Sequence, residues 1–301
     1  MSEFPTQGAR PVWIASYPRS GNTYLRIILR TFFRLPSYSV YYVEGTTHAD
    51  PSAEALQEAP VLPRRWRETI SDREDAEPIL IKTHEAPSDS APAVFIARDG
   101  RAAIHSYYHY HKKFSFEQPS LTEIIAGACQ FGSWSEHYWA WSPKTRPKTL
   151  LIGYDDLVCH PGMIVQRLAA FLNLNPENAT LPEFEALQKR SPEFFRRGQN
   201  TDYLSEWTQA QLELFNQLHA SAMKDLGFGI STGVPFAGAE VVKELAQSAA
   251  RLHRMYLEQL SSFGEAAAQQ QATVQDLSNQ IEQLSNEVME LSRQIDQELK
   301  P

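Results

Sequence analysis

The stretch WIASYPRSGNTYLRIIL, residues 13–29, constrains the fold of this chain more than any other. A short apolar run reaches Tyr17, the loop PRSG follows, and an amphipathic run begins at Asn22. This pattern predicts a strand, a tight loop and a helix start, where exposed N–H groups favour an anion. Gly21 can adopt backbone angles that are closed to other residues, which lets the chain approach a ligand closely. Because the pattern G-x-x-x-x-G-K-[ST] is absent, the predicted anion differs from a magnesium-bound nucleoside triphosphate.

Apolar, β-rich runs alternate with helical patterns through the first half of the chain. Continuous apolar strands separated by helices indicate a parallel sheet covered on both faces, so the predicted fold class is α/β. Segment 36–78 is rich in Pro, Glu, Asp and aromatic residues, and is interpreted as an insertion above the sheet that could select an acceptor. The predicted strands cover 12–17, 79–84, 93–99 and 149–157, and the predicted helices cover 22–34, 101–112, 120–142, 161–172 and 205–225.

The composition changes near residue 230, where a Gly-rich stretch is interpreted as a linker. The predicted organisation is a globular domain at 1–229, a linker at 230–239 and a helical segment at 240–301. In that last segment β-branched residues recur every seven positions, and a leucine follows three residues after each of the first three. This pattern favours a parallel two-stranded coiled coil, and therefore a homo-oligomer. The alternative is one surface helix packed on its own domain. The repeat is formed by Val274, Leu277, Ile281, Leu284, Val288, Leu291 and Ile295.

Charge and composition narrow the classes of partner. The formal net charge is -8, which argues against nucleic acid as the main partner. No run of eighteen apolar residues occurs, so no transmembrane segment is expected, and the first twenty residues show no apolar leader. The two cysteines, Cys129 and Cys159, lack metal-type spacing and fit a reducing compartment, so a cytoplasmic location is expected.

A second group of polar residues follows the predicted strand at 93–99. Arg98 ends this strand, and Ser106 lies eight residues later, about two turns into the next helix. Both side chains can converge on one phosphate at the carboxyl edge of the sheet, where such folds bind ligands. The alternatives are a surface ion pair of Arg98 with Asp99 or a neighbouring acid, and a solvated or back-bonded hydroxyl at Ser106.

Histidines are frequent in this region of the sequence. Lys82 and His84 are two residues apart near the end of a predicted strand, so both side chains project to the same face. His105 and His109 are four apart on a predicted helix, which is the spacing of metal ligands. No third ligand is apparent from the sequence, so we expect no metal.

Taken together, these motifs resemble those of sulfotransferases that use 3′-phosphoadenylyl sulfate (PAPS), and most closely the cytosolic branch. YPRSGNTY resembles the family's phosphosulfate loop, and VFIARDGRAAIHSYYHYHKK its 3′-phosphate segment. ILIKTHEAP, FGSWSEHYWAW, LIGYDDL and FFRRGQNTDY resemble four further family segments, and all occur in family order across about residues 10–228. The resemblance implies a three-layer P-loop-like fold with a central parallel sheet flanked by helices.

The resemblance also implies roles for individual residues. His84 would be the general base, with Lys82 beside the transferred group and Arg19 as a third catalytic residue. Arg19 stands where lysine is usual, and arginine retains the charge but cannot donate a proton at ordinary pH. Thr201 and Tyr203 replace a usual glycine and tryptophan. The resemblance assigns Arg19, Ser20, Gly21, Asn22 and Thr23 to the phosphosulfate, Tyr24 and Tyr154 to the adenine, and Arg98, Ser106, Arg196, Arg197 and Gly198 to the 3′-phosphate.

The expected reaction is in-line sulfuryl transfer from PAPS to a hydroxyl acceptor, with adenosine 3′,5′-bisphosphate (PAP) as product. Like phosphoryl transfer, it depends on positioning and charge stabilisation, here without a metal. The acceptor is a small molecule, a lipid or a glycan. The alternative function is a catalytically inactive nucleotide-binding scaffold assembled through its coiled coil. A P-loop kinase is disfavoured by the missing Lys-[ST] pair.

Overall fold

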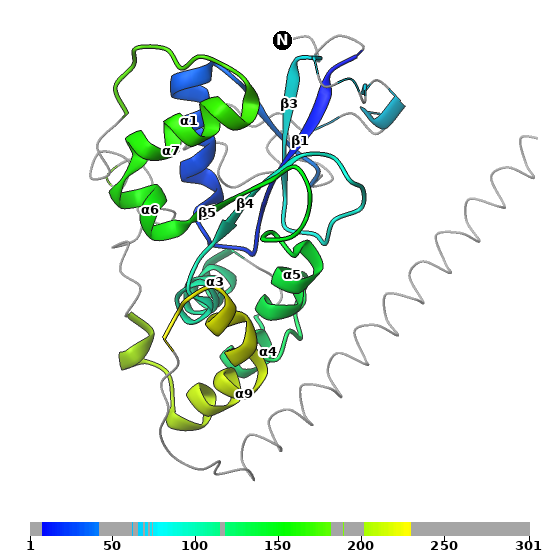
Figure 1. The fold of residues 1–301 in the computed structure, drawn as a ribbon. Coiled ribbons are helices and arrows are strands. Elements are labelled where there is room, and N and C mark those ends of the chain that lie inside the picture. The colour runs from blue at the N-terminus through cyan, green and yellow to red at the C-terminus, as the bar shows by residue number, and fades with distance from the viewer. Residues whose placement is uncertain are drawn as a thin grey trace, which may run out of the picture. The chain divides into compact units, whose positions relative to one another are not determined.

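The computed structural model in Figure 1 describes a large part of the chain. The described residues are 8–41, 62, 66–68, 70–71, 73, 75–114, 118–181, 189 and 202–229. The predicted linker and coiled coil, together with Arg196, Arg197 and Gly198, lie outside them.

Five strands of the described residues form one parallel sheet in the order β2-β3-β1-β4-β5. β1 lies at its centre, with Trp13 opposite Ile81 of β3 on one side and Ala93 of β4 on the other. Because the strands are parallel, their carboxyl ends share one edge, where β1, β3 and β4 each lead into a predicted site segment. The strands are β1 Arg10–Ser16, β2 Ser37–Ser39, β3 Pro78–Thr83, β4 Ala93–Ala97 and β5 Thr149–Gly153.

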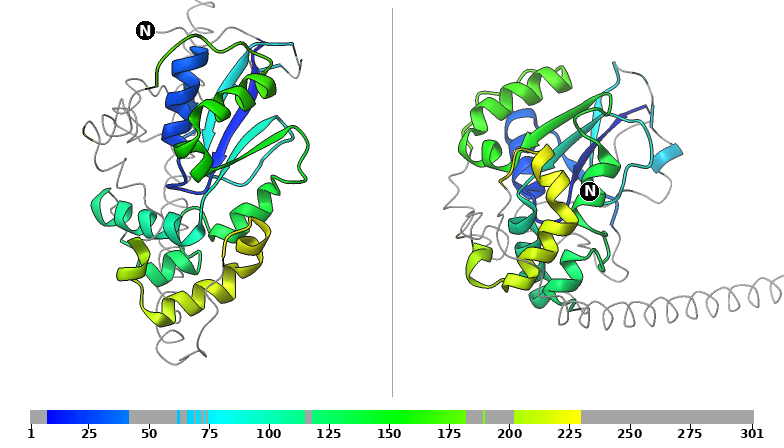
Figure 2. Two further views of the ribbon diagram at one scale, coloured as in Figure 1. Left: turned by 60° about the vertical axis from the view of Figure 1, so that its left-hand side comes forward. Right: turned by 60° about the horizontal axis from the view of Figure 1, so that its bottom comes forward.

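Side chains of β1 alternate between two apolar cores, one on each face of the sheet. Ile14 packs in the core under α1 and α7, whereas Trp13 packs in the core that contains residues of α5. Helices α3, α4 and α9 lie together beyond the carboxyl end of the sheet (Figures 1 and 2). The helices are α1 Asn22–Phe33, α3 Gly100–Phe114, α4 Leu121–Ile125, α5 Trp134–Trp141, α6 Tyr154–Cys159, α7 Pro161–Leu172 and α9 Gln209–Asp225, with short 3₁₀ helices η1 Trp66–Glu68 and η2 Asp202–Ser205.

The predicted α/β class and the parallel sheet flanked by helices are confirmed, and two predicted elements are corrected. The helix predicted at 120–142 is two helices, because Gly127 adopts φ +80°, and a Cβ there would lie 2.6 Å from Ser133. Ser133 then caps α5 with its hydroxyl. The strand predicted at 149–157 stops at Gly153, where α6 begins.

The insertion predicted at 36–78 contains an edge strand that the periodicity did not indicate. β2 is only three residues long, and its Ser37 hydroxyl accepts a hydrogen bond of 2.7 Å from Nε of the buried Arg26. A strand this short offers too few residues for an alternating pattern. Tertiary contacts therefore decide its pairing with β3.

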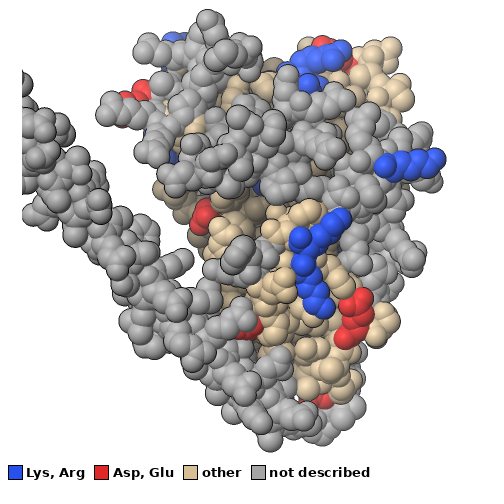
Figure 3. Space-filling view, turned by 180° about the vertical axis from the view of Figure 1, so that it is seen from behind, with Lys and Arg blue, Asp and Glu red and all other residues tan. Residues whose placement is uncertain are grey.

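In the coloured part of the face seen in Figure 3, the blue lysine and arginine side chains lie at separate places among tan residues. Two cations of the predicted site are instead buried, Lys82 at 9% exposure and Arg98 at 8%. Within the described residues, none of the helices combines the length and the apolar character needed to cross a bilayer.

Candidate active site

The loop between β1 and α1 has the backbone geometry expected of an anion-binding loop. Gly21 is the N-cap of α1 with φ +100°, and Arg19 also has a positive φ of 65°. The first helical hydrogen bond runs from the Leu25 N–H to the Gly21 carbonyl, at 3.1 Å. The N–H groups before this bond belong to the first turn of α1, the part of a helix where an anion is favoured.

Two side chains of this loop are buried beneath it. The Asn22 amide donates to the Ile14 carbonyl at 3.0 Å and contacts the Ser16 hydroxyl at 3.3 Å. Its side-chain donors therefore fasten the loop to β1, and the backbone N–H is what Asn22 can offer to an anion. Ser20 is 1% exposed, and its hydroxyl has no hydrogen-bond partner among the described residues.

A cationic cluster joins the loop to the residues that follow β4. Arg98 donates from Nη1 to the Arg19 carbonyl at 2.8 Å. Arg19 in turn donates from Nε to the Ser106 hydroxyl at 3.2 Å, and its guanidinium lies over the Tyr110 ring, 5.4 Å from the centroid. Arg19 thus links Arg98 to Ser106, and all three are residues that the sequence motifs assign to phosphate groups.

Tyr154, the first residue of α6, completes the cluster. The Arg98 guanidinium lies 4.1 Å from the centre of its ring, a cation–π distance. A Cβ on Gly21 would lie 2.8 Å from Cδ2 of Tyr154, so a side chain at position 21 would collide with the ring. The close approach explains why glycine is needed here in addition to its positive φ.

The alternative of a surface pair between Arg98 and Asp99 is wrong. Asp99 instead pairs with Arg101 through two bonds of 2.6 and 3.0 Å, and both side chains are about nine-tenths buried. The same carboxylate accepts the Arg101 N–H at 2.9 Å near the start of α3. The Asp99 carboxylate is therefore bonded to the backbone and side chain of Arg101, whereas Arg98 donates to the loop.

His84, one residue beyond β3, lies against the end of β1. Its Nδ1 is 2.7 Å from the Ser16 carbonyl oxygen. A carbonyl can only accept, so Nδ1 carries the proton and Nε2 of the neutral ring has a lone pair. This bond fixes the tautomer that a base needs and joins His84 to the strand that leads into the anion loop.

Aromatic rings enclose His84. Tyr41 stacks on it with centroids 5.9 Å apart and planes 16° apart, and Phe131 meets it edge-on at 5.4 Å. The Tyr41 hydroxyl also accepts the backbone N–H of His84. Lys82 Nζ lies 5.6 Å from the Tyr41 ring centre, so one tyrosine contacts both predicted catalytic residues of β3. Burial raises the pKa of Tyr41, so its hydroxyl stays protonated.

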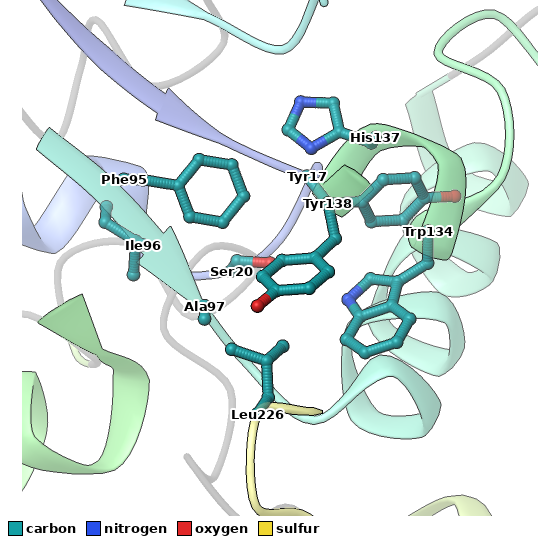
Figure 4. Close-up of a pocket in the computed structure, with 9 residues that line it drawn as sticks. All are labelled: Tyr17, Ser20, Phe95, Ile96, Ala97, Trp134, His137, Tyr138 and Leu226. Atoms are coloured by element: carbon teal, nitrogen blue, oxygen red, sulfur yellow. The ribbon is translucent and has the colours of Figure 1, made fainter. Parts of the chain in front are cut away.

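A buried histidine, His137 of α5, lies near the partly buried His84. It is 5% exposed, and neither of its ring nitrogens has a well-formed hydrogen bond within the described residues. Burial lowers the pKa of His137 to about 3, and the backbone of His84 raises it by a smaller amount. Figure 4 shows His137 at a small cavity surrounded by aromatic rings, with room for about one water molecule. The cavity is lined by Tyr17, Ser20, Phe95, Ile96, Ala97, Trp134, His137, Tyr138 and Leu226.

The structure thus joins most of the predicted site residues at one sheet edge. Arg19, Gly21, Arg98, Ser106 and Tyr154 form the cationic cluster, and Lys82 and His84 share the aromatic cluster. Tyr24 of α1 is 5% exposed within the apolar core that also contains residues of α7. Sequence reasoning missed Tyr41, Phe131 and His137, whose only signal was the aromatic content of 36–78 and of the FGSWSEHYWAW motif.

The chain is similar to known proteins in sequence and in fold. A family model described as "Sulfotransferase domain" matches residues 9–227. Cytosolic sulfotransferase 1 of Danio rerio is 28% identical over 263 residues, which span 72% of this chain and 84% of that protein. Two solved structures match with a TM-score of 0.50 and 16% identity. Mouse sulfotransferase SULT7A1 complexed with PAP covers 72% of this chain and 86% of its own. Retinol dehydratase in complex with androsterone and the inactive cofactor PAP covers 75% and 82%.

The two structural matches support the fold, and the family model extends over most of the chain. The chain therefore belongs to the PAPS-dependent sulfotransferase family that its motifs resemble.

Proposed function

We propose that the protein transfers the sulfuryl group of PAPS to the hydroxyl of an apolar acceptor, with His84 as general base. The observation that carries this proposal is the 2.7 Å contact between His84 Nδ1 and the Ser16 carbonyl, which leaves Nε2 as the proton acceptor. His84 lies one residue past β3, beside the strand that leads into the anion loop. A base is needed there because the acceptor loses its proton as it attacks sulfur.

The residues of the loop fit the anionic donor. Gly21 adopts a positive φ and packs too closely against Tyr154 for a side chain, and Ser20 presents a buried hydroxyl with no partner within the described residues. Arg98 and Ser106 would bind the 3′-phosphate together with Arg196, Arg197 and Gly198. PAPS supplies the sulfuryl group when bound, and PAP leaves.

In this proposal each side chain has one task. His84 Nε2 takes the proton of the acceptor hydroxyl as the oxygen–sulfur bond forms and the sulfur–phosphate oxygen bond breaks. Lys82 and Arg19 stabilise charge on the transferred and departing oxygens, which preorganised cations do best when water is excluded. Arg19 is held toward Ser106 by its Nε bond, so it stabilises the phosphate side rather than donating a proton.

The acceptor side is aromatic. Tyr41 and Phe131 pack against His84, and the buried His137 offers polar ring nitrogens among apolar walls. Such walls suit a phenol, a sterol or another lipid-like alcohol better than a glycan, whose many hydroxyls would lose water without replacement. A related fold binds androsterone, in the retinol dehydratase complex.

The test is a transfer assay with labelled PAPS and a panel of phenols, sterols, aliphatic alcohols and sugars. We expect labelled product with phenols or sterols and a rise in melting temperature with PAP. Binding of PAP without transfer to any acceptor would favour the inactive scaffold. A rise in melting temperature with ATP and Mg²⁺ but not with PAP would remove the sulfotransferase proposal.

We further propose the domain division 1–229, 230–239 and 240–301, with the last segment forming a parallel coiled-coil dimer of a cytoplasmic enzyme. The support is the heptad repeat of β-branched residues and leucine in the sequence. Ending the chain at residue 232 should give a folded monomer by light scattering. An oligomer of unchanged mass would contradict this assignment.

A further inference from the structure

Three side chains outside the proposed catalytic machinery converge at the contact between α3 and the residues that follow η2. His109 Nε2 lies 2.9 Å from Glu206 Oε2, and His105 Nε2 lies 3.8 Å from Glu206 Oε1. The two imidazole rings meet edge to face with centroids 4.7 Å apart. Both histidines thus direct the same ring nitrogen at one carboxylate.

The sequence showed only half of this arrangement. His105 and His109 are one helical turn apart, and the third ligand comes from a residue nearly one hundred positions later in the chain. The backbone around Glu206 is fixed by its neighbours, since Tyr203 and Trp207 are 7% and 6% exposed and their rings are 5.5 Å apart. Arg101 of α3 also lies over the Tyr203 ring at 5.2 Å. Packing therefore holds the carboxylate opposite the two histidines.

A simple ion pair explains only part of the geometry. An ion pair needs one histidine, yet the carboxylate presents a separate oxygen to each ring. Two imidazole nitrogens and one carboxylate are a ligand set of zinc sites that keep a fourth position open. Imidazole also suits copper, nickel and iron, whereas magnesium and calcium prefer oxygen ligands.

We propose that His105, His109 and Glu206 bind one divalent transition-metal ion such as Zn²⁺. Their ligand atoms lie within 4.8 Å of one another. Zinc ligands at about 2.0 to 2.1 Å lie closer together than that, so binding requires a small closing movement. The exposed Glu206 side chain, 45% accessible, and the part-buried His109 can supply it, while His105 stays fixed at 5%.

The site would act as a clamp between α3 and the chain after η2. Ser106 lies on the same helix, between the two histidines in sequence, and η2 follows the segment assigned to the 3′-phosphate. The metal makes no contact in the sulfuryl transfer proposed above, so the inference does not depend on that function. It predicts that the metal stabilises the folded chain, as any ligand selective for the native state does.

The experiment is a Zn²⁺ titration of the full chain without an affinity tag, after treatment with EDTA, followed by calorimetry and melting temperature. His109→Ala and Glu206→Gln are the test variants, because the buried His105 could fail for reasons of folding. His160→Ala, at an exposed position, is the matched control. We expect one Zn²⁺ per chain, at least tenfold weaker binding in both test variants, and unchanged binding in the control.

Substituting Co²⁺ gives an independent readout, because its visible spectrum reports coordination number. A tetrahedral or five-coordinate spectrum that disappears in Glu206→Gln supports the site. Unchanged Zn²⁺ affinity in both test variants, or no saturable binding to the parent chain, would overturn it. Melting of each variant without metal checks that lost binding does not reflect lost folding.

Discussion

The anion loop and the neighbouring segment around His84 lie at the same sheet edge but are built in opposite ways. Around the loop, Arg19, Arg98 and Ser106 contact one another through directed polar bonds of 2.8 and 3.2 Å. Around His84 the contacts are rings, and the polar bonds are those that orient the imidazole. One side is organised to hold charge, the other to exclude water.

The difference matches two chemical demands. A donor with phosphate groups needs several fixed cations and N–H groups, which are effective when buried and paired. An acceptor hydroxyl needs a neutral base in a site without competing water. The comparison teaches that one sheet edge can supply both environments, because adjacent parallel strands end there with unrelated side chains.

The largest expected effect comes from removing His84, the proposed general base on the aromatic side of the site. His84→Ala should reduce turnover about 100- to 10,000-fold, the usual contribution of a general base. Affinity for PAP should change little, because His84 is not part of the cationic cluster. Kinetics with saturating donor, and PAP binding by calorimetry, measure the two effects, with His160→Ala as control. Full turnover in His84→Ala would remove the general-base assignment.

The cationic side should respond in binding instead. Arg98→Ala removes the bond to the Arg19 carbonyl and a charge for the phosphate, so PAP should bind about 10- to 150-fold more weakly, as expected for about 1.5 to 3 kcal/mol. Arg98→Lys keeps the charge but loses the planar guanidinium, so its affinity for PAP should lie between those of the parent protein and Arg98→Ala. Calorimetric titration with PAP decides this. Equal affinity in all three proteins would mean that the cluster does not bind the phosphate.

Acid should destabilise the fold through two buried histidines. Burial lowers the pKa of His137 to about 3 and that of His219 to about 4, whereas the unfolded value is about 6.5. Below pH 6.5 the two histidines take up protons in the unfolded chain but not yet in the folded chain. The free energy of unfolding therefore decreases as the pH falls from about 6.5 to about 4. Each group contributes a slope of up to about 1.4 kcal/mol per pH unit.

Urea unfolding at several pH values between 5 and 7 tests this, with His137→Gln as the variant. The variant should show the shallower pH dependence. Identical slopes in the two proteins would contradict a neutral, buried His137.

The smallest expected effect concerns the ring that stacks on the base. Tyr41→Phe keeps the stacking on His84 but removes the hydroxyl that accepts its backbone N–H. The loss of about 0.5 to 1.5 kcal/mol predicts a two- to tenfold decrease in turnover. Tyr41→Leu, which also removes the ring, should decrease turnover further. If both variants match the parent enzyme, the aromatic side does not position the base.

The sequence was most informative where function requires a fixed order of residues. The strand, loop and helix at 13–29 were predicted and found, because Gly21 and the polar residues beside it have one sensible local structure. The helix at 120–142 was wrong, because the positive φ of Gly127 outweighed the helical pattern around it. β2 went unseen, since three residues carry no periodicity.

The sequence by itself determined the α/β class, the anion loop and the histidine beside β3, because local chemistry and strand order suffice for each. The tertiary structure alone decided which side chains surround that histidine. Tyr41 and Phe131 are 43 and 47 residues from it, and Ser16, which fixes its tautomer, is 68 residues away. Glu206 meets His105 and His109 for the same reason. Contacts between distant segments depend on how the sheet and helices pack, and no local pattern records that packing.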